Sequence, residues 1–477
     1  MSRGAAGRAA IIGIGATEFS KNSGRTPMEL AVESCEAALA DAGLPAEKVD
    51  GIVTFSAEQN LEIEVARNLR IPALRHFSMV PHGGGAACGT IGQAAAAVHA
   101  GSADYVLCYR AFNERSWHRF GSGVQGRHGG AESFDISFSW TSPFGLLTPA
   151  SWVAMFATRY MHQYGATSED FGRVAVADRR HAANNPAAFF HEQPITLADH
   201  QESRWIVEPL RLLDCCQESD GGQALLVTTV ERARDLAPTP AVIAGAAQGA
   251  TDDQQAMRSY YRDNIAAIPE MGLCARQLWE ATGLGPDDIQ VANIYDHFTP
   301  LVLPQLEEFG FCRRGEAADF LRDGNIELGG RLPINTNGGQ LGDPVHPVDV
   351  GLAELASVGV DWETATQFDV PIAQKVRGLP STAEPELLEL GENQRSEVVV
   401  DVGDLYVVRA KSGSFPELSR TEPHLGDGGD VVPVVARMAC WSSVAPWAAA
   451  AITAGVGARS RARSTVVTRR AWPPSDS

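Results

Sequence analysis

The sequence predicts an α/β fold in which strands and helices alternate along two similar parts of the chain. Three observations support this prediction. The chain has 477 residues, a length typical of about two to four domains. Hydrophobic residues make up 44% and charged residues 20%, as in ordinary globular proteins. Segments typical of strands and helices alternate over residues 9–109 and again over residues 222–309.

In the first part, three apolar runs of strand length are separated by two helical patterns. The strands are expected at residues 9–14, 49–55 and 105–109. The helices are expected at residues 27–42 and 86–100, and each is followed by a glycine that can end it, Gly43 and Gly101. This order is typical of a parallel sheet with crossover helices.

Residues 113–209 lack this regular alternation, because Trp, His, Ser and Pro interrupt their apolar runs. We therefore predict an inserted, partly helical loop domain here. The alternation then resumes. Strands are expected at 222–230, 241–247 and 291–295, and helices at 271–282 and 300–309.

The composition changes again after about Gly342. Residues 363–397 are acidic and contain several prolines, and residues 398–408 have the pattern of one or two strands. The arginine-rich end, residues 458–477, is predicted to be unstructured.

Charge and cysteine content exclude several classes of protein. The net charge of -19 disfavours nucleic acid as a partner. The eight cysteines are scattered without a CxxC pair, which indicates a reducing compartment. The longest apolar run, residues 445–456, is shorter than the roughly 18–20 residues of a membrane span. We therefore expect a cytoplasmic protein with no membrane span.

Two short motifs carry chemistry. Glycines lead into the predicted helix at 86–100, and the backbone N–H groups of Gly84 and Gly85 could hold an oxyanion there. Cys88 follows, either as a nucleophile activated by the helix N-terminus or as a small core residue. Tyr295 and His297 stand at a strand end, where general acids and bases collect in α/β folds. The histidines elsewhere lack metal-ligand spacing, so no metal site is expected.

The motifs taken together resemble the thiolase-superfamily lipid-transfer proteins. The resemblance is greatest to the steroid side-chain-cleaving aldolase subunits of actinobacterial cholesterol and bile-acid degradation, which are similar to sterol-carrier-protein-type thiolases. It covers about residues 8–342. It is carried by the segments GIGATEFSKNSGR (13–25), HGGGAACGT (82–90), YRAFNERS (109–116), EPLRLLDCCQESDG (208–221), YDHFTPLVLPQLEEFGFC (295–312) and GGRLPINTNGGQLG (329–342).

The resemblance implies a thiolase fold, with two βαβαβαββ halves in αβαβα layers. It places the N-terminal half at residues 8–239, including the loop domain at about 113–209, and an incomplete C-terminal half at 240–342. It implies a homodimer that works with a zinc-containing OB-fold protein of the DUF35 type. No cofactor is expected in this chain: CoA is part of the substrate, and zinc is expected only in the partner.

The reaction implied is a retro-aldol cleavage. A steroid hydroxylated at C17 and carrying a side-chain acyl-CoA is split into a 17-keto steroid and propionyl-CoA. The resemblance makes Tyr295 the base for the 17-hydroxyl, with His297 as a neighbouring donor. It also weakens the case for Cys88: the nucleophilic cysteine of sterol-carrier-type thiolases falls at Gly84, which leaves Cys88 one turn inside the helix.

The chain departs from the family at its second catalytic position. A tyrosine is expected six residues after Gly339, but Val345 stands there and His346 is one position late. Valine cannot donate to an enolate oxygen, and loss of such a donor typically costs about 10²–10³ in rate. Residues 343–477 do not resemble the family. We interpret them as a frameshift that begins near Gly342, with a divergent C-terminal domain as the alternative.

Two other functions stay open at this point. One is an acyltransferase or thiolase that acts on acyl-CoA through Cys88. The other is a non-catalytic lipid- or acyl-CoA-binding protein that docks the DUF35 partner.

Overall fold

A computed structural model describes ten ranges of the chain, all within a compact unit that spans Met1–Val444. They are residues 7–55, 58–80, 87–117, 119, 141–236, 240–254, 262–342, 396–401, 406–411 and 434–438.

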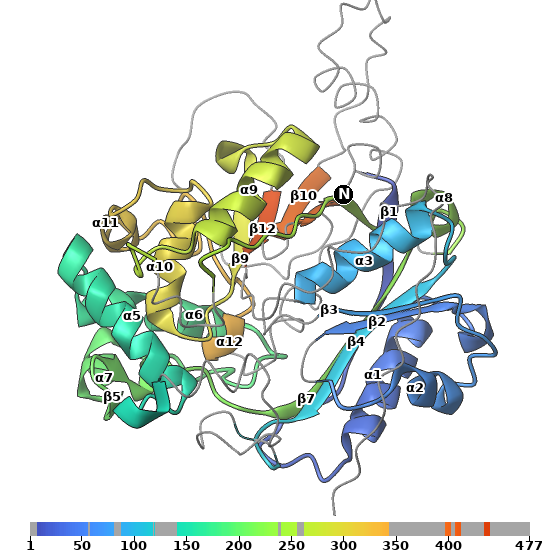
Figure 1. Cartoon of the computed structure of the whole chain (residues 1–477), viewed down its shortest axis with the longest axis horizontal. Coiled ribbons are helices and arrows are strands. Elements are labelled where there is room, and N and C mark those ends of the chain that lie inside the picture. The colour runs from blue at the N-terminus through green and yellow to red at the C-terminus, as the bar shows by residue number, and fades with distance from the viewer. Residues whose placement is uncertain are drawn as a thin grey trace, which may run out of the picture. The chain divides into compact units, whose positions relative to one another are not determined.

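The first part of the chain forms a five-stranded region of a mixed sheet (Figure 1). Its strands are β1 (Ala9–Ala16), β2 (Gly51–Phe55), β3 (His76–Val80), β4 (Val106–Asn113) and β7 (Asp220–Thr229), in the order β3-β2-β4-β7-β1. β2 pairs in parallel with β3 and β4, as the alternating pattern predicts. β1 runs in the same direction as β4, but it does not pair with it as the pattern suggests, because β7 lies between β1 and β4 and is antiparallel to both.

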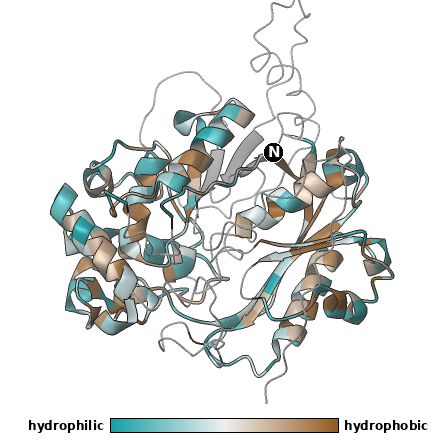
Figure 2. Ribbon diagram, viewed as in Figure 1, coloured by the Kyte–Doolittle hydropathy of each residue, from teal (hydrophilic) through white to brown (hydrophobic). Residues whose placement is uncertain are grey.

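Alternate residues of these strands pack against different helices, because successive side chains of a strand point to opposite faces. Ala9 and Ile11 of β1 lie in the same core cluster as α3 (Ala87–His99). Ala10 and Ile12 lie in the cluster that contains α1 (Pro27–Asp41). The sheet is therefore covered on both faces, and Figure 2 shows brown, apolar stretches in its strands.

Several short elements of the first part had no clear signal in the sequence. They are the helices α2 (Glu62–Asn68) and α8 (Val230–Ala233) and the edge strand β3. β3 alternates partly buried and exposed residues before its buried last residue, Val80, so it lacks the continuous apolar run that predicts a central strand.

The second part continues the same sheet. β8 (Ala241–Gly245) pairs with β1, and the order then runs β8-β11-β10-β12-β9. These strands are β9 (Val291–Ile294), β10 (Ser396–Asp401), β11 (Tyr406–Lys411) and β12 (Val434–Met438). The pattern at 398–408 therefore corresponds to two strands, β10 and β11, which pair with each other in an antiparallel hairpin.

The region 113–209 is partly helical, as predicted. It contains α5 (Pro149–Tyr164), α6 (Ser168–Asn184) and α7 (Leu197–Glu202), followed by the small strand pair β5 (Trp205–Val207) and β6 (Leu210–Arg211). Each helix begins after a threonine whose hydroxyl accepts a backbone N–H of the first turn. These capping threonines are Thr148, Thr167 and Thr196.

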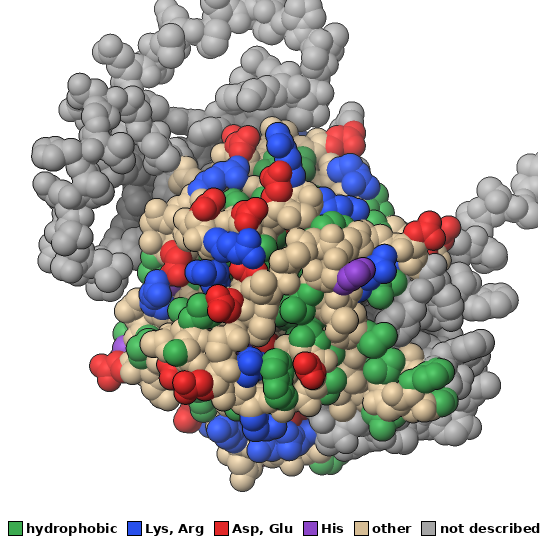
Figure 3. Space-filling model, turned by 90° about the vertical axis from the view of Figure 1, so that its left-hand side faces the viewer, with side chains coloured by type: hydrophobic (Ala, Val, Ile, Leu, Met, Phe, Trp, Pro, Cys, Tyr) green, Lys and Arg blue, Asp and Glu red, His purple; other side chains and the backbone are tan. Residues whose placement is uncertain are grey.

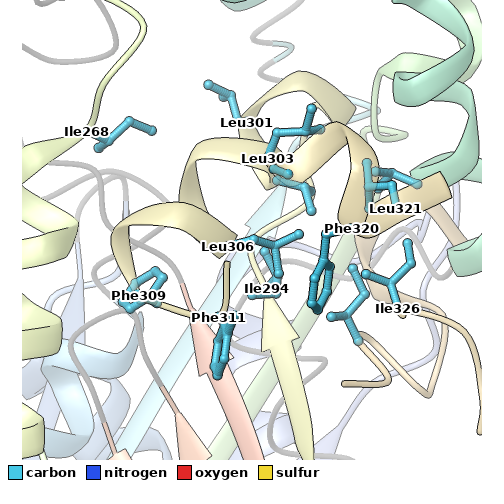
Figure 4. Packing of buried hydrophobic residues seen from close by; sticks show 14 of the residues in the cluster. Ile268, Ile294, Leu301, Leu303, Leu306, Phe309, Phe311, Phe320, Leu321 and Ile326 are labelled. Carbon is cyan, nitrogen blue, oxygen red and sulfur yellow. The ribbon is translucent and has the colours of Figure 1, made fainter. Parts of the chain in front are cut away.

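The core of the second part surrounds α10 (Thr299–Glu308) (Figure 4). Leu301, Leu303 and Leu306 of this helix are fully buried and share a cluster with Ile294 at the end of β9. The same cluster contains residues of α5, α6, α9 (Pro269–Thr282) and α11 (Ala317–Arg322). The loop between β9 and α10 is thus held at both ends by a packed core.

The side of the molecule that carries α5, α7 and α11 is shown in Figure 3. Basic and acidic side chains are interspersed on it with hydrophobic ones. Two ion pairs on this part of the fold join α6 to later segments, Arg322 to Asp170 at 2.7 Å and Arg180 to Glu327 at 2.7 Å. Within the described ranges, no helix combines the length and the apolar character needed to cross a bilayer.

Candidate functional site

Tyr295 is the first residue after β9 and lies in the loop that leads into α10. Its side chain is buried, and its ring stacks on that of His297 with the centroids 3.9 Å apart and the planes 15° apart. Its carbonyl oxygen accepts a 2.7 Å hydrogen bond from Nε2 of Gln305, which reaches back from α10. The end of β9, the hydrogen bond from α10 and the stacked ring of His297 together fix the position of the Tyr295 phenol.

Charged groups surround this phenol. Burial raises the pKa of Tyr295 well above its ordinary value, and the nearby Cys216, Glu114 and Asp296 raise it further, whereas Arg110 lowers it. A phenol in this setting gives up its proton only if a neighbouring group accepts it or a cation stabilises the phenolate. Both kinds of group lie close by.

His297 is neutral at physiological pH. Burial lowers its pKa to about 3, and a hydrogen bond with the backbone of Tyr295 only partly opposes this. Its stacked ring therefore covers one face of the Tyr295 phenol without contributing a positive charge. Its carbonyl oxygen accepts a 3.0 Å hydrogen bond from the backbone N–H of Cys216.

Arg110 and Glu114 reach the site from the carboxyl end of β4. Arg110 is a residue of β4 with only 4% of its surface exposed. Glu114 follows the strand, and burial raises the pKa of its carboxyl to about 8 although Arg110 opposes the shift. Neither residue was singled out from the sequence, although both lie in the segment YRAFNERS on which the family resemblance rests.

The loop between β9 and α10 also contributes to a pair of buried carboxyl groups. Asp178 of α6 is hydrogen-bonded to Asp296, the residue after Tyr295. Asp296 also accepts the backbone N–H groups of Gln340 and Leu341, each at 2.9 Å. Burial and the charge of Asp296 raise the pKa of Asp178 well above its ordinary value. Asp178 is therefore the protonated member, and it donates to the Asp296 carboxylate.

This pair makes stability depend on pH. A group with a raised pKa in the folded state stabilises the protein fully below its unfolded-state pKa, and this contribution is lost as pH rises through the folded-state value. We expect the free energy of unfolding to fall toward alkaline pH. Asp178→Asn keeps a donor to Asp296 without a titrating proton, so it should flatten that fall. Urea denaturation at a series of pH values measures how steeply the free energy of unfolding falls with pH. An equally steep fall in the variant would contradict the pairing of Asp178 with Asp296.

The other predicted site residues divide into two groups. Cys88 is the second residue of α3 and is 1% exposed, so its thiol lies within the core. Gly84, Gly85, Val345 and His346 lie outside the described residues. Over the ranges that the structure covers, no three His, Cys, Asp or Glu side chains are grouped so that they could hold a metal ion.

Comparison with known proteins places the chain in a family. The thiolase C-terminal domain-like family model matches residues 254–359. A steroid side-chain-cleaving aldolase from Thermomonospora curvata is 64% identical over 349 residues, which are 73% of this chain and 89% of that protein. A 17-hydroxy-3-oxo-4-pregnene-20-carboxyl-CoA lyase from Mycobacterium tuberculosis is 58% identical over 349 residues, 73% of this chain and 90% of that protein.

Solved structures agree with this. The Ltp2-ChsH2(DUF35) aldolase superposes with a TM-score of 0.71 at 54% sequence identity. The superposition covers 85% of this chain and 98% of that chain. Human mitochondrial 3-ketoacyl-CoA thiolase superposes with a TM-score of 0.51 at 14% identity over 85% of this chain and 99% of that chain, a likeness of fold alone. The chain therefore belongs to the family of steroid side-chain-cleaving aldolases within the thiolase superfamily.

Proposed function

We propose that this chain cleaves the side chain of a 17-hydroxy steroid acyl-CoA by a retro-aldol reaction, giving a 17-keto steroid and propionyl-CoA. The observation that carries the proposal is the buried phenol of Tyr295, which lies at a strand end, stacks on a neutral histidine and is close enough to Arg110 and Glu114 for both to shift its pKa. A relative with 58% identity is named as a 17-hydroxy-3-oxo-4-pregnene-20-carboxyl-CoA lyase, and this name supports cleavage of a 17-hydroxy steroid CoA thioester.

The reaction needs a base at the hydroxyl and no acyl-enzyme. Tyr295 takes the proton of the C17 hydroxyl, the bond from C17 to the side chain breaks, and its electron pair moves to the α-carbon of the thioester. The ketone forms at C17, and protonation of the enolate gives propionyl-CoA. The buried position of Cys88 speaks against the thiolase alternative, because that route requires a thiolate exposed to the substrate.

The test is an assay of the purified chain together with its DUF35 partner. The steroid thioester is the substrate, and mass spectrometry follows the 17-keto steroid and propionyl-CoA. Equal amounts of the two products are expected. Thioester exchange without a ketone product would support the thiolase alternative. Partner binding without any turnover would support the binding-protein alternative.

The assembly is part of the same proposal. The aldolase structure that this chain resembles pairs Ltp2 with a DUF35 protein, and we expect this chain to bind such a partner and to form a homodimer. β3, at one end of the described sheet, exposes 60% of Phe77 and 51% of Met79, as expected of a strand that meets a second copy. Sedimentation of the mixture should give two copies of each chain, and one copy of this chain would contradict the dimer.

The end of the chain is a separate question. We favour a frameshift near Gly342, because Val345 stands where the family has its second catalytic tyrosine. The alternative, a divergent domain, is supported by β10, β11 and β12, which lie between β8 and β9 in the sheet.

Sequencing the native gene across codons 335–350 decides between the two. We expect it to restore a tyrosine codon at position 345 and a family-like ending. A gene that encodes Asp343-Pro344-Val345-His346 would rule out the frameshift, and the chemistry would then have to proceed without the second tyrosine.

A further inference from the structure

We propose that Asn335 is a positioning residue for Tyr295: its side-chain oxygen holds the backbone of Ile294, the residue directly before the tyrosine, and so fixes where the phenol stands. This inference rests on the proposed function, because it states what keeps the reacting oxygen in place. It is carried by the hydrogen bonds of the Asn335 backbone and side chain.

The segment that ends at Asn335 lies beside β9 as a short additional strand. The N–H of Ala292 donates to the carbonyl of Pro333 at 3.0 Å, and the carbonyl of Ala292 accepts the N–H of Asn335 at 2.9 Å. In a regular parallel ladder, the backbone carbonyl of Asn335 would next accept the N–H of Ile294. Here the side chain takes its place, because Oδ1 of Asn335 accepts this N–H at 2.7 Å.

The backbone turns away from β9 at Asn335, because this residue has a φ of 45°, in the left-handed region. Its own carbonyl therefore accepts the N–H of Gly338 at 2.8 Å and lies 3.3 Å from Nδ1 of His181. Asn335 is 1% exposed, and a buried residue with a left-handed backbone is strained unless its surroundings hold it in place. Asparagine is among the few residues other than glycine that adopt this backbone readily. The chain can thus turn here while the side chain completes the ladder.

The turn that begins at Asn335 binds the residues on both sides of Tyr295. The residue before the tyrosine, Ile294, donates its N–H to Asn335. The residue after it, Asp296, accepts the two N–H groups at positions 340 and 341, each at 2.9 Å. The backbone of Tyr295 is therefore held on both sides by one turn. A displacement of about 1 Å at a reacting group can cost about 10²-fold in rate, so these bonds matter to the reaction.

The nitrogen of the same side chain limits which residue can stand at this position. Nδ2 of Asn335 donates to Oδ2 of Asp178 at 3.5 Å, and Asp178 is itself hydrogen-bonded to Asp296. Glycine would allow the left-handed backbone but has no acceptor for the Ile294 N–H. An aspartate anion would provide the acceptor, but it cannot donate and would add a third carboxylate to the pair. Asparagine combines the left-handed backbone, the acceptor and the donor.

The first test does not depend on turnover. Amide hydrogen exchange of two residues of β9 is compared in the complex of the full chain with its DUF35 partner, by mass spectrometry with fragmentation that resolves single amides. In Asn335→Gly the N–H of Ile294 loses its acceptor and should exchange at least about 10-fold faster. The N–H of Ala292 donates to the backbone carbonyl of Pro333, so its exchange should stay unchanged.

Two results of this experiment would overturn the proposal even if the chain cleaves no steroid. One is an unchanged exchange rate at Ile294 in Asn335→Gly. The other is an equal acceleration at Ile294 and Ala292, because Asn335 would then support the whole edge of β9 and not the residue before Tyr295 in particular.

The second test is steady-state cleavage by the same complex. In Asn335→Gly, kcat should fall about 10²-fold. KM should change little, because the buried side chain of Asn335 holds the backbone and not the substrate. Asn264→Gly is the matched control: it removes a side-chain amide that accepts the N–H of Ala266 at 3.1 Å, and it should keep the full kcat. A loss confined to KM, or an equal loss of kcat in the control, would contradict a positioning role.

Asn335→Asp is the rescue variant. The titratable groups around this side chain are Asp178 and His181 of α6 and Asp296 of the loop. A protonated carboxyl group can accept from Ile294 and donate to Asp178, whereas an ionised one cannot donate. Relative to the unmodified complex at the same pH, kcat of this variant should be nearly full at acidic pH and should fall as pH rises.

A relative kcat as low as that of Asn335→Gly at every pH would contradict the proposal, because the oxygen that holds Ile294 is still present in Asn335→Asp. Absence of cleavage in the unmodified complex would instead count against the proposed function, and the exchange rates at Ile294 and Ala292 would then decide the role of Asn335 by themselves.

Discussion

Replacing Tyr295 by phenylalanine should lower the rate of steroid thioester cleavage at least about 10²-fold, the usual contribution of a general base. The substitution removes one oxygen and keeps the ring that stacks on His297, so the local packing should survive. Binding of the substrate should change little, and the loss should appear in kcat. The measurement is a steady-state assay of propionyl-CoA release by the complex with its DUF35 partner.

Tyr164→Phe is the matched control. Tyr164 lies at the end of α5 and its hydroxyl accepts a 3.0 Å hydrogen bond from Asn264, away from the cluster around Tyr295. The control should keep the full rate. If Tyr295→Phe also kept the full rate, a different residue would have to be the base.

Asp296→Ala should lower the free energy of unfolding by about 3 kcal/mol, as expected when buried partners lose a charged acceptor. The N–H groups of Gln340 and Leu341 would lose their acceptor in the protein interior, and Asp178 would lose its partner. The midpoint of urea denaturation measures the effect.

Asp287→Ala serves as the control for the loss of a carboxylate. The Asp287 side chain is 94% exposed and pairs with Arg331 at 2.9 Å, so its removal should cost no more than about 1 kcal/mol. Equal midpoint shifts in the two variants would show that Asp296 does not anchor the turn at 339–341.

Much of the fold follows from the sequence because its buried strands and amphipathic helices have strong patterns. The strand predicted at 9–14 is β1 and the helix predicted at 27–42 is α1, with differences only at their ends. The direction of pairing was harder to predict. β1 is followed by a helix and a strand, as in a parallel unit, yet its neighbours are β7 and β8. Pairing partners so distant along the chain leave no local signal.

The site was predictable only where a motif is compact. Tyr295, Asp296 and His297 are consecutive, so their place at a strand end was visible. Arg110 and Glu114 were not, because an arginine in a strand and a glutamate in a turn are ordinary in isolation. Their position along the chain could have identified Arg110 and Glu114. The segment YRAFNERS lies at the end of a predicted strand, and the carboxyl ends of parallel strands lie at the same edge of a sheet. Asp178 had no such signal, since it lies within a helix and meets Asp296 only through tertiary packing.

The place of β1 between β7 and β8 has a consequence for biosynthesis. The first strand to leave the ribosome can complete its pairing only after residue 245 has been made. At roughly 5–20 residues per second, the wait is on the order of tens of seconds. During it, the apolar run of β1 lacks both neighbours and can pair with other nascent chains. Slow translation or a shortage of chaperones should therefore reduce the soluble yield of this protein before any of its chemistry is affected.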